Sequence, residues 1–422
     1  MTRDLLKIFI LAACLSGIIS PAVRVDAAEA NSLKALIEEA RANNPELRAL
    51  EQKAKAVEAR ATAEGAFDDP TLKVELEDLP RDRPLNISPG NAMMTRYTLS
   101  QMFPFPGKLS LKEKIALKEA VMAKAAFRGR ELEVTNLVKD AYFDYAYMNE
   151  SLEAIKAIKE LLSIMSAAAG TRYSTGGVSQ QDVIKVNAET VMLENDIITI
   201  EARKEVGAAR LKNLLGRAQD SALFDSAAPD ALPKKRIEFK TEEILKSALE
   251  KNPGIKMAEA EVEAGELGTR LAGKNYYPDF MVGVAPVERD GRFDTFDFML
   301  QMNIPIWGGK YRGLFAEAEA NSHAMRARLL AEKNMKLFEV KEAALMVEAA
   351  GRMMSLYETG LLPTAEISFE SALKNYQSGR IDLIMLLDTQ RELKKTKLGY
   401  LGAVVEYRKT VASLERLVGA DF

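Results

Sequence analysis

The sequence predicts a mainly α-helical protein with a small β part, built from two tandem repeats. Three observations predict it: a composition rich in Ala, Leu, Glu and Lys, long stretches free of proline, and landmarks that recur 200 to 208 residues apart. Of the 422 residues, 28% are charged and 7% are aromatic, a balance typical of long or coiled-coil helices. Helices should therefore dominate the fold.

The landmarks lie in the same order in both halves of the chain. In each half an Asn-Pro pair follows a short amphipathic segment, a Gly-Lys segment ends a pair of strands, and a Tyr and a Gly mark a turn between helices. Such ordered matches indicate a duplication. We expect a first repeat at 28–218, a linker at 219–240 and a second repeat at 241–422. The matched pairs are Asn44-Pro45 with Asn252-Pro253, residues 101–108 with 301–310, and residues 173–178 with 376–381.

Each repeat should contain one very long helix and an antiparallel partner. Residues 110–171 contain no proline, and their apolar side chains recur at three- and four-residue steps up to Gly170, which we interpret as a breaker. At roughly 1.5 Å per residue this helix would be about 90 Å long. Its counterpart at 311–375 carries Pro363, which predicts a kink. The partner helices are expected at 178–215 and 381–417, and their many alanines allow close packing.

Four segments alternate apolar and polar or small residues with the period of a β-strand. About ten residues per strand matches a tilted transmembrane strand, which needs ~9–11, although a half-buried soluble hairpin shows the same alternation. Four strands cannot close a barrel, and lipid forbids an open sheet edge. Either the strands lie outside a membrane or several chains share one barrel. The apolar face would carry Leu72, Val74, Leu76, Tyr97, Leu99, Phe280, Val282, Val284, Phe296, Phe298 and Leu300.

The first residues predict an export signal at 1–27. Basic Arg3 and Lys7 precede an apolar run at 8–19, which is too short to span a membrane, and small residues before Ala28 favour cleavage after Ala27. The alternative is a lipobox in which Cys14, the single cysteine, becomes a lipidated first residue.

Other functional classes find little support in the composition. The net charge of −3 and the lack of a basic stripe argue against nucleic acid as a partner. The single histidine, His323, has no second histidine or thiolate to share a transition metal, so we predict no metal site and no cofactor. Because no catalytic constellation emerges, we predict that the chain is not an enzyme.

With these features the sequence resembles the TolC-like outer-membrane efflux protein family over nearly all of its mature length. The features that carry the resemblance are the paired Asn-Pro segments, the two strand pairs that end at 103–108 and 304–310, and the turns at Gly176 and Gly379. The resemblance implies a homotrimer in which three subunits give four strands each to one twelve-stranded barrel in the cell outer membrane. The helices would continue this barrel as a tunnel across the periplasm.

The function implied by the resemblance is that of a passive exit duct in a tripartite efflux or type I export system. Its partners would be an inner-membrane pump, a periplasmic adaptor of the membrane fusion type and outer-membrane lipid. The cargo stays open between small molecules and metal ions, although the Pro-Gly-Lys turn is similar to the heavy-metal branch of the family. The alternative function is a periplasmic coiled-coil adaptor or scaffold that is not inserted in a membrane. An adaptor would need compact β-domains and a single helical hairpin, whereas this chain predicts two hairpins.

The resemblance also implies a gate at the periplasmic end of the tunnel. Tyr376, Gly379 and Asp388 stand in places that the family uses near the second-repeat turn, with Arg380 close by. Asp182 stands where the first-repeat turn carries an Asp. If the second-repeat hairpin lines the tunnel, threefold symmetry would bring three Asp388 carboxylates around one axis and favour cations.

The match at the gate is partial. Ile381 replaces an Arg, and Met385 replaces the first gate Asp of the best-known member. Asp182 also fits a capping box with Ser179. Asp388 lies about two turns inside its helix, where no cap is available, so it faces either solvent or the pore. Trp307, beside a strand end, is a candidate membrane-interface anchor.

Overall fold

The computed structural model describes residues 32–79, 87–89, 92–174, 176–224 and 232–420. The expected signal peptide at 1–27, Cys14 and part of the expected linker lie outside the described residues.

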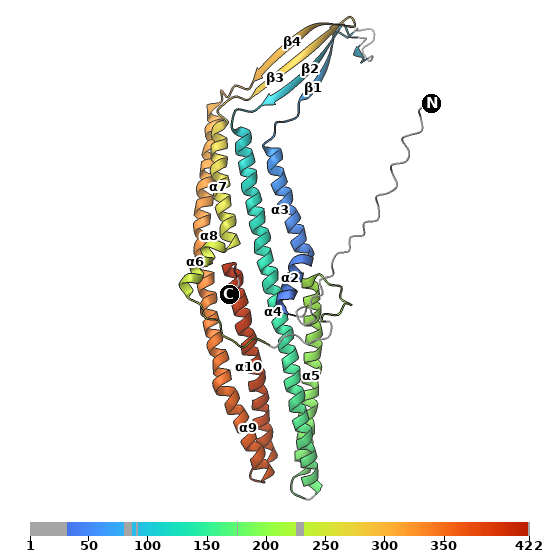
Figure 1. The fold of residues 1–422 in the computed structure, drawn as a ribbon, viewed down its shortest axis with the longest axis vertical. Coiled ribbons are helices and arrows are strands. Elements are labelled where there is room, and N and C mark those ends of the chain that lie inside the picture. Colours follow the sequence, from blue (N-terminus) through green and yellow to red (C-terminus); the bar gives the residue numbers. More distant parts are fainter. Residues whose placement is uncertain (1–31, 80–86, 90–91, 175, 225–231, 421–422) are drawn as a thin grey trace, which may run out of the picture.

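The molecule is elongated, with one sheet at one end and two helical hairpins at the other (Figure 1). In both halves of the chain two helices precede two strands, and a long helix and its antiparallel partner follow. The mainly helical fold with a small β part is therefore confirmed. The first half contains α2 (Leu33–Asn43), α3 (Pro45–Glu64), β1 (Thr71–Glu77), β2 (Met94–Phe103), α4 (Lys108–Ser174) and α5 (Gln180–Leu215). The second half contains α6 (Thr241–Lys251), α7 (Pro253–Lys274), β3 (Phe280–Arg289), β4 (Arg292–Met302), α8 (Gly308–Leu356), the π-helical turn η2 (Tyr357–Leu361), α9 (Leu362–Gln377) and α10 (Leu383–Val418).

The long helix α4 runs for 67 residues, about 100 Å at ~1.5 Å per residue. It continues through Gly170, so the interpretation of Gly170 as a breaker is wrong. A single helical glycine costs only about 1 kcal/mol relative to Ala, which a helix of this length tolerates. The chain turns instead at Gly176, whose φ of +75° belongs to the left-handed region.

The kink predicted at Pro363 takes the form of a π-helical turn. Proline cannot donate the usual backbone hydrogen bond, and its ring crowds the carbonyl four residues earlier. The helix widens to a π-helical turn over η2, just before Pro363, and then continues as the α-helix α9. The predicted kink therefore does not interrupt the helix, because α8, η2 and α9 follow one another without a gap (Figure 1).

Both Asn-Pro pairs join helices end to end halfway along the molecule. The Asn44 side-chain oxygen caps α3, and its Nδ2 donates to the carbonyl of Leu214 at the end of α5 (3.1 Å). Asn252 caps α7 in the same way and donates to the carbonyl of Leu417 at the end of α10 (2.7 Å). Each short upper helix therefore meets the end of a lower helix.

Glycine is required where these helix ends meet. Gly216 and Gly419 have φ of +70° and +81° and end α5 and α10. A Cβ on Gly216 would lie 2.9 Å from the carbonyl oxygen of Asn43, and one on Gly419 would lie 3.0 Å from that of Lys251. The duplication thus extends to a pair of glycines that the sequence landmarks did not include.

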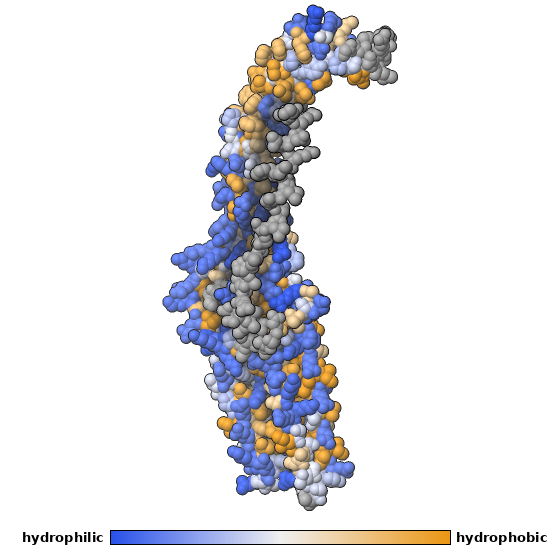
Figure 2. All heavy atoms as spheres, turned by 45° about the vertical axis from the view of Figure 1, so that its right-hand side comes forward, coloured by the Kyte–Doolittle hydropathy of each residue, from blue (hydrophilic) through white to orange (hydrophobic). Residues whose placement is uncertain are grey.

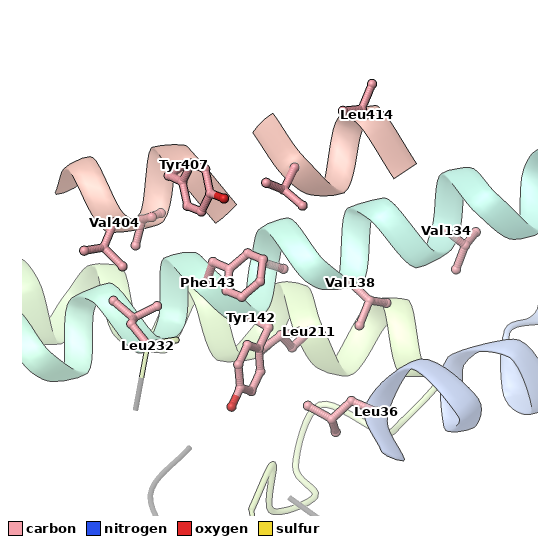
Figure 3. Packing of buried hydrophobic residues seen from close by; sticks show 14 of the residues in the cluster. Leu36, Val134, Val138, Tyr142, Phe143, Leu211, Leu232, Val404, Tyr407 and Leu414 are labelled. Carbon is pink, nitrogen blue, oxygen red and sulfur yellow. The ribbon is translucent and has the colours of Figure 1, made fainter. Parts of the chain in front are cut away.

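Two hydrophobic clusters hold the helices together. The first lies around the midpoint, where side chains of α2, α4, α5, α6, α8 and α10 pack against each other (Figure 3). Tyr142 and Phe143 of α4 point into it from adjacent positions. The second cluster fills the lower hairpins between α4, α5, α9 and α10 and includes Tyr376.

Residues 233–237 of the expected linker lie against α10. Arg408 donates to the carbonyls of Pro233 and Lys235, both at 2.6 Å, and the Tyr407 hydroxyl accepts from the backbone N–H of Ile237 at 2.6 Å. Burial lowers the pKa of Arg408.

The four strands form one antiparallel sheet in the order β1-β2-β3-β4. β1 has seven residues, fewer than the ten expected, whereas β2, β3 and β4 have ten or eleven. Asp290 and Gly291, both with positive φ, make the two-residue turn between β3 and β4, a dipeptide favoured in such hairpins. β1 and β4 are the outer strands, each with one edge that has no partner among the described residues.

None of the helices among the described residues combines the length and the apolar character that crossing a membrane requires.

Candidate gate and lipid-facing sheet

The apolar side chains predicted to face lipid share one face of the sheet. Directly opposed residues of neighbouring strands point to the same side, and one row crosses all four strands from Leu72 through Leu99 and Val284 to Phe298. These four side chains are exposed, Phe298 by 85%. The other predicted residues join the same face through the pairs Val74 with Tyr97, Leu76 with Thr95, Val282 with Leu300, Phe280 with Met302, and Phe296 with Pro286.

The opposite face is small, polar and partly charged. Thr98, Ser100 and Ala285 are buried there. Arg96 reaches across the sheet to form ion pairs with Glu77 and, at 3.2 Å, with Asp297. An apolar exposed face backed by a polar one is the pattern of a strand between lipid and a wet interior.

Figure 2 shows hydrophobic residues gathered over the sheet and the strand–helix junction, with hydrophilic residues at the hairpin end of the strands. Trp307, the candidate interface anchor, is 71% exposed at this junction, beside the similarly exposed Ile304 and Ile306. Exposure of a tryptophan next to a strand end suits a membrane interface.

At the other end of the molecule, Asp182 is the third residue of α5 and forms a capping box with Ser179. Its carboxylate accepts from the Ser179 backbone N–H at 3.1 Å, and its own N–H donates to the Ser179 hydroxyl at 3.3 Å. Asp382 caps α10 through the backbone N–H of Met385. The capping box expected at Asp182 is therefore confirmed. A role of Asp182 in a gate stays a prediction.

Tyr376 contacts the first-repeat hairpin through Arg172. The guanidinium of Arg172 lies 5.2 Å from the centre of the Tyr376 ring and donates to the Tyr376 carbonyl at 3.1 Å. Tyr376 is 4% exposed. A Cβ on Gly379, whose φ is +74°, would lie 3.4 Å from the same guanidinium. Arg172 thus brings together two of the predicted gate residues. Arg380 is exposed, and its backbone N–H donates to the carbonyl of Asn375.

Asp388 is connected to the first repeat through Arg391. Its side chain on α10 is 62% exposed, and its carboxylate lies 3.3 Å from the guanidinium of Arg391. The guanidinium of Arg391 also holds the carboxylate of Glu189 on α5 at 2.7 Å, and this hydrogen bond raises the pKa of Arg391. Glu189 is buried, with only 2% of its side chain exposed.

A third cross-repeat contact lies further along the same helices, where Lys394 pairs with Asp196 at 3.1 Å. Asp196 follows Glu189 by seven residues, so both acids lie on one face of α5. Sequence reasoning missed Arg172, Glu189 and Arg391, because a single charged residue on a long helix carries no local pattern that reveals its partner.

His323 lies on α8 in an open depression shared with Glu266, Glu319 and Arg326. Within the described residues no group of three metal-binding side chains gathers there or elsewhere.

These features define a class of protein: an elongated, duplicated helical protein that carries a four-stranded sheet with one apolar exposed face. The chain belongs to the outer membrane efflux protein family, which it matches over residues 36–217 and 244–420. The two matched stretches leave out 218–243, which contain the expected linker. The resemblance to the TolC-like outer-membrane efflux proteins is therefore confirmed, and members of this family are channel proteins rather than enzymes.

Individual relatives agree with this membership. The chain is 21% identical over 403 residues to the cobalt-zinc-cadmium resistance protein CzcC of Cupriavidus metallidurans, which covers 93% of this chain and 91% of that protein. Among solved structures, CusC superposes with a TM-score of 0.77 at 19% identity and covers 92% of both chains. The outer membrane protein VceC of Vibrio cholerae superposes with a TM-score of 0.76 at 19% identity, covering 92% of this chain and 96% of its own.

Proposed function

We propose that the chain is one subunit of a homotrimeric outer-membrane duct through which cargo leaves the cell passively. The observation that carries the proposal is the sheet, whose apolar face is exposed and whose outer strands β1 and β4 each leave one edge unpaired within the described residues. Lipid tolerates no open sheet edge, and four strands are too few to close a barrel. Three copies would supply twelve strands, an even number as in other outer-membrane barrels.

The helices support the same assembly. Among the helices of the lower half, α4 contacts both α5 and α10, and α10 contacts α8 and also meets α5 through the ion pairs of Arg391 and Lys394. In the assembly that we propose, α5 and α8 form the two edges of this layer. Both edges carry exposed apolar residues at seven-residue spacing, the spacing by which helices pack side by side. They are Ile184, Val191 and Ile198 on α5, and Phe338 with Leu345 and Met346 with Met353 on α8.

The hairpin ends would form the periplasmic entrance. The contacts of Arg172 with Tyr376 and of Arg391 with Glu189 favour a closed arrangement by holding the two hairpins of one chain together. In the tripartite system that we propose, an inner-membrane pump and a periplasmic adaptor deliver cargo here and loosen these contacts. The alternative of a periplasmic adaptor or scaffold is disfavoured by the family membership and by the presence of two hairpins.

Fractionation of cells and light scattering of the detergent-extracted protein test this function. We expect the protein in the outer-membrane fraction, with a protein mass of three mature chains. N-terminal sequencing should find Ala28 first, whereas a lipidated Cys14 would replace the cleavage assignment by the lipoprotein alternative. A monomer recovered from the soluble periplasm would contradict the duct.

Divalent metal ions are the cargo class that we propose first. A relative that covers 93% of this chain is a cobalt-zinc-cadmium resistance protein, and the Pro-Gly-Lys turn suits the same assignment. Deletion of the gene should then increase sensitivity to Co²⁺, Zn²⁺ or Cd²⁺, and the restored gene should reverse the effect. Increased sensitivity to lipophilic drugs alone would replace metal ions by small organic molecules as the cargo.

A further inference from the structure

One ion pair fastens the sheet to the helices inside the chain. Lys108, the first residue of α4, is 7% exposed, and its Nζ lies 2.8 and 3.0 Å from the two carboxylate oxygens of Asp279. The same carboxylate accepts from the backbone N–H of Phe105 at 2.7 Å. Asp279 directly precedes β3, so this clamp joins the turn after β2 to the start of the neighbouring strand.

The duplication supplies a second set of the same residues. Leu72 pairs with Leu99 in the first hairpin, and Val282 pairs with Leu300 in the second, with all four side chains on the apolar face. When Leu72 and Leu99 are aligned with Val282 and Leu300, Phe103-Pro104-Phe105 is aligned with Ile304-Pro305-Ile306. The turn after β2 then ends at Lys108, and the turn after β4, which is one residue longer, ends at Lys310.

Counting back from the matched strand residues identifies the second acid. Asp279 lies three positions before Val282, and Asp69 lies three positions before Leu72. Because side-chain direction alternates along a strand, this equal offset preserves the face, whereas the neighbouring Asp68 would not. Asp69 is therefore the counterpart of Asp279.

The second set cannot meet within one chain. Asp69 precedes β1 and Lys310 follows β4, which lie at opposite edges of the sheet. Both side chains are exposed, and neither makes an ion pair among the described residues. The Nζ of Lys310 rests 5.6 Å from the ring centre of Tyr311.

We propose that Lys310 and Asp69 of a second copy form the same clamp between subunits, with β4 paired to β1 in the register of β2 and β3. This proposal rests on the trimer proposed above and specifies how its copies join. In β2 and β3, Gln101 opposes Val282 and Leu99 opposes Val284. Transferred to the junction between copies, Met302 opposes Leu72 and Leu300 opposes Val74, which continues the apolar face without a break. Each copy uses both of its edges, so the association is head-to-tail and closes as a ring.

Cross-linking between copies tests the clamp. Cys14 is the only cysteine and lies in the expected leader, so introduced cysteines are unique in the mature chain. The variant Asp69→Cys/Lys310→Cys, treated in membranes with a short bifunctional thiol reagent, should give covalent dimers and trimers on a denaturing gel. Either single variant should give none. The matched control Lys108→Cys/Asp279→Cys should be linked within one chain and migrate as a monomer.

Charge reversal provides the second measurement. Lys310→Glu should lower the temperature at which the trimer dissociates in detergent, and Lys310→Glu/Asp69→Lys should restore it. A lysine that binds a lipid phosphate instead would show no such restoration. A trimer of normal mass that is neither cross-linked nor rescued by the exchange would overturn the clamp and leave the duct standing. A monomeric wild-type protein would overturn the duct itself.

Discussion

The side-chain amide of Asn44 caps α3 with its oxygen and holds the end of α5 with its nitrogen. Asn252 repeats both bonds in the second half. Such a residue satisfies backbone groups that a helix end would otherwise leave unpaired. The two asparagines therefore fix the point at which the upper helices continue the lower ones.

Asp140 on α4 is a half-buried acid that lowers the stability of the folded protein once it is ionised. Burial raises the pKa of its carboxyl, the charges of Asp144 and Glu406 raise it further, and Lys409 and Arg210 oppose the shift. The folded protein thus binds this proton more tightly than the unfolded chain does. The stability contributed by Asp140 is present below the ordinary pKa of 3.8 and is lost as the pH rises through the raised pKa.

Asp140→Asn should therefore gain stability over the wild type as the pH rises through that window, with the gain constant above it. Thermal unfolding followed by circular dichroism between acidic and neutral pH measures the difference. Asp144→Asn is the matched control, because it removes the ion pair with Lys409 at 2.6 Å and should lower the unfolding temperature at neutral pH. A difference between Asp140→Asn and the wild type that did not vary with pH would contradict the account.

The sequence identified the two Asn-Pro pairs, but it did not predict the hydrogen bonds from their asparagines to the ends of α5 and α10. The pattern that reveals an N-cap is contained in adjacent residues, whereas the partner carbonyls lie 170 and 165 positions away. The role of Arg172 could not be predicted for the same reason, since its partner Tyr376 belongs to the other repeat. Only the tertiary structure brings such residues together.

At the scale of elements, the π-helical turn before Pro363 contacts the neighbouring helix α10. The Tyr357 side chain of η2 lies against Gly399 of α10, where an added Cβ would be 2.8 Å from the Tyr357 hydroxyl. Another glycine of α10, Gly402, has nothing within 4 Å of such a Cβ. The two glycines form a matched pair within one helix.

Gly399→Ala should destabilise the protein by about 1–3 kcal/mol, because the added methyl group overpacks against Tyr357. Gly402→Ala should instead stabilise it by up to about 1 kcal/mol through helix propensity. Chemical denaturation followed by circular dichroism measures both values. Equal effects of the two substitutions would show that the contact with Tyr357 does not constrain α10.

For the sheet, the two faces should respond differently to charge. Val282→Arg on the apolar face should cost about 2–4 kcal/mol per subunit near the middle of the bilayer. Gln301→Arg, on the opposite face of the neighbouring strand, should be tolerated. Folding yield into lipid vesicles measures the difference, and equal yields for both variants would count against lipid on the apolar face.

Strand alternation alone predicted which side chains share the apolar face, because the period of two fixes direction once a strand is assigned. It did not predict that β1 has only seven residues, nor the bulge between Val287 and Glu288. Bulges and strand ends depend on pairing with the next strand, which local sequence does not encode.

At the scale of the whole molecule, we expect the cross-repeat contacts of Arg172 and Arg391 to hold the proposed gate closed. Removing Arg391 leaves the buried carboxylate of Glu189 without its partner, which disfavours the closed arrangement. Arg172→Ala removes the contact with Tyr376. The double variant Arg172→Ala/Arg391→Ala should conduct at least several-fold more than the wild type in a planar bilayer.

Two further variants separate the roles of Tyr376 and Asp388 in the proposed gate. Tyr376→Phe alone should change conductance little, because the ring contact remains and the Tyr376 hydroxyl has no hydrogen-bond partner among the described residues. Asp388→Ala should weaken a preference for cations if the three carboxylates face the tunnel. An Asp388→Ala trimer with unchanged selectivity and conductance would place Asp388 outside the tunnel.

The most direct test of the duct is an electron cryomicroscopy reconstruction of the purified protein in lipid nanodiscs. We predict three copies around one axis, with twelve strands inside the lipid disc and the helices extending from one side of it. A reconstruction that placed the strands outside the lipid, or that contained a single copy, would contradict the proposed function.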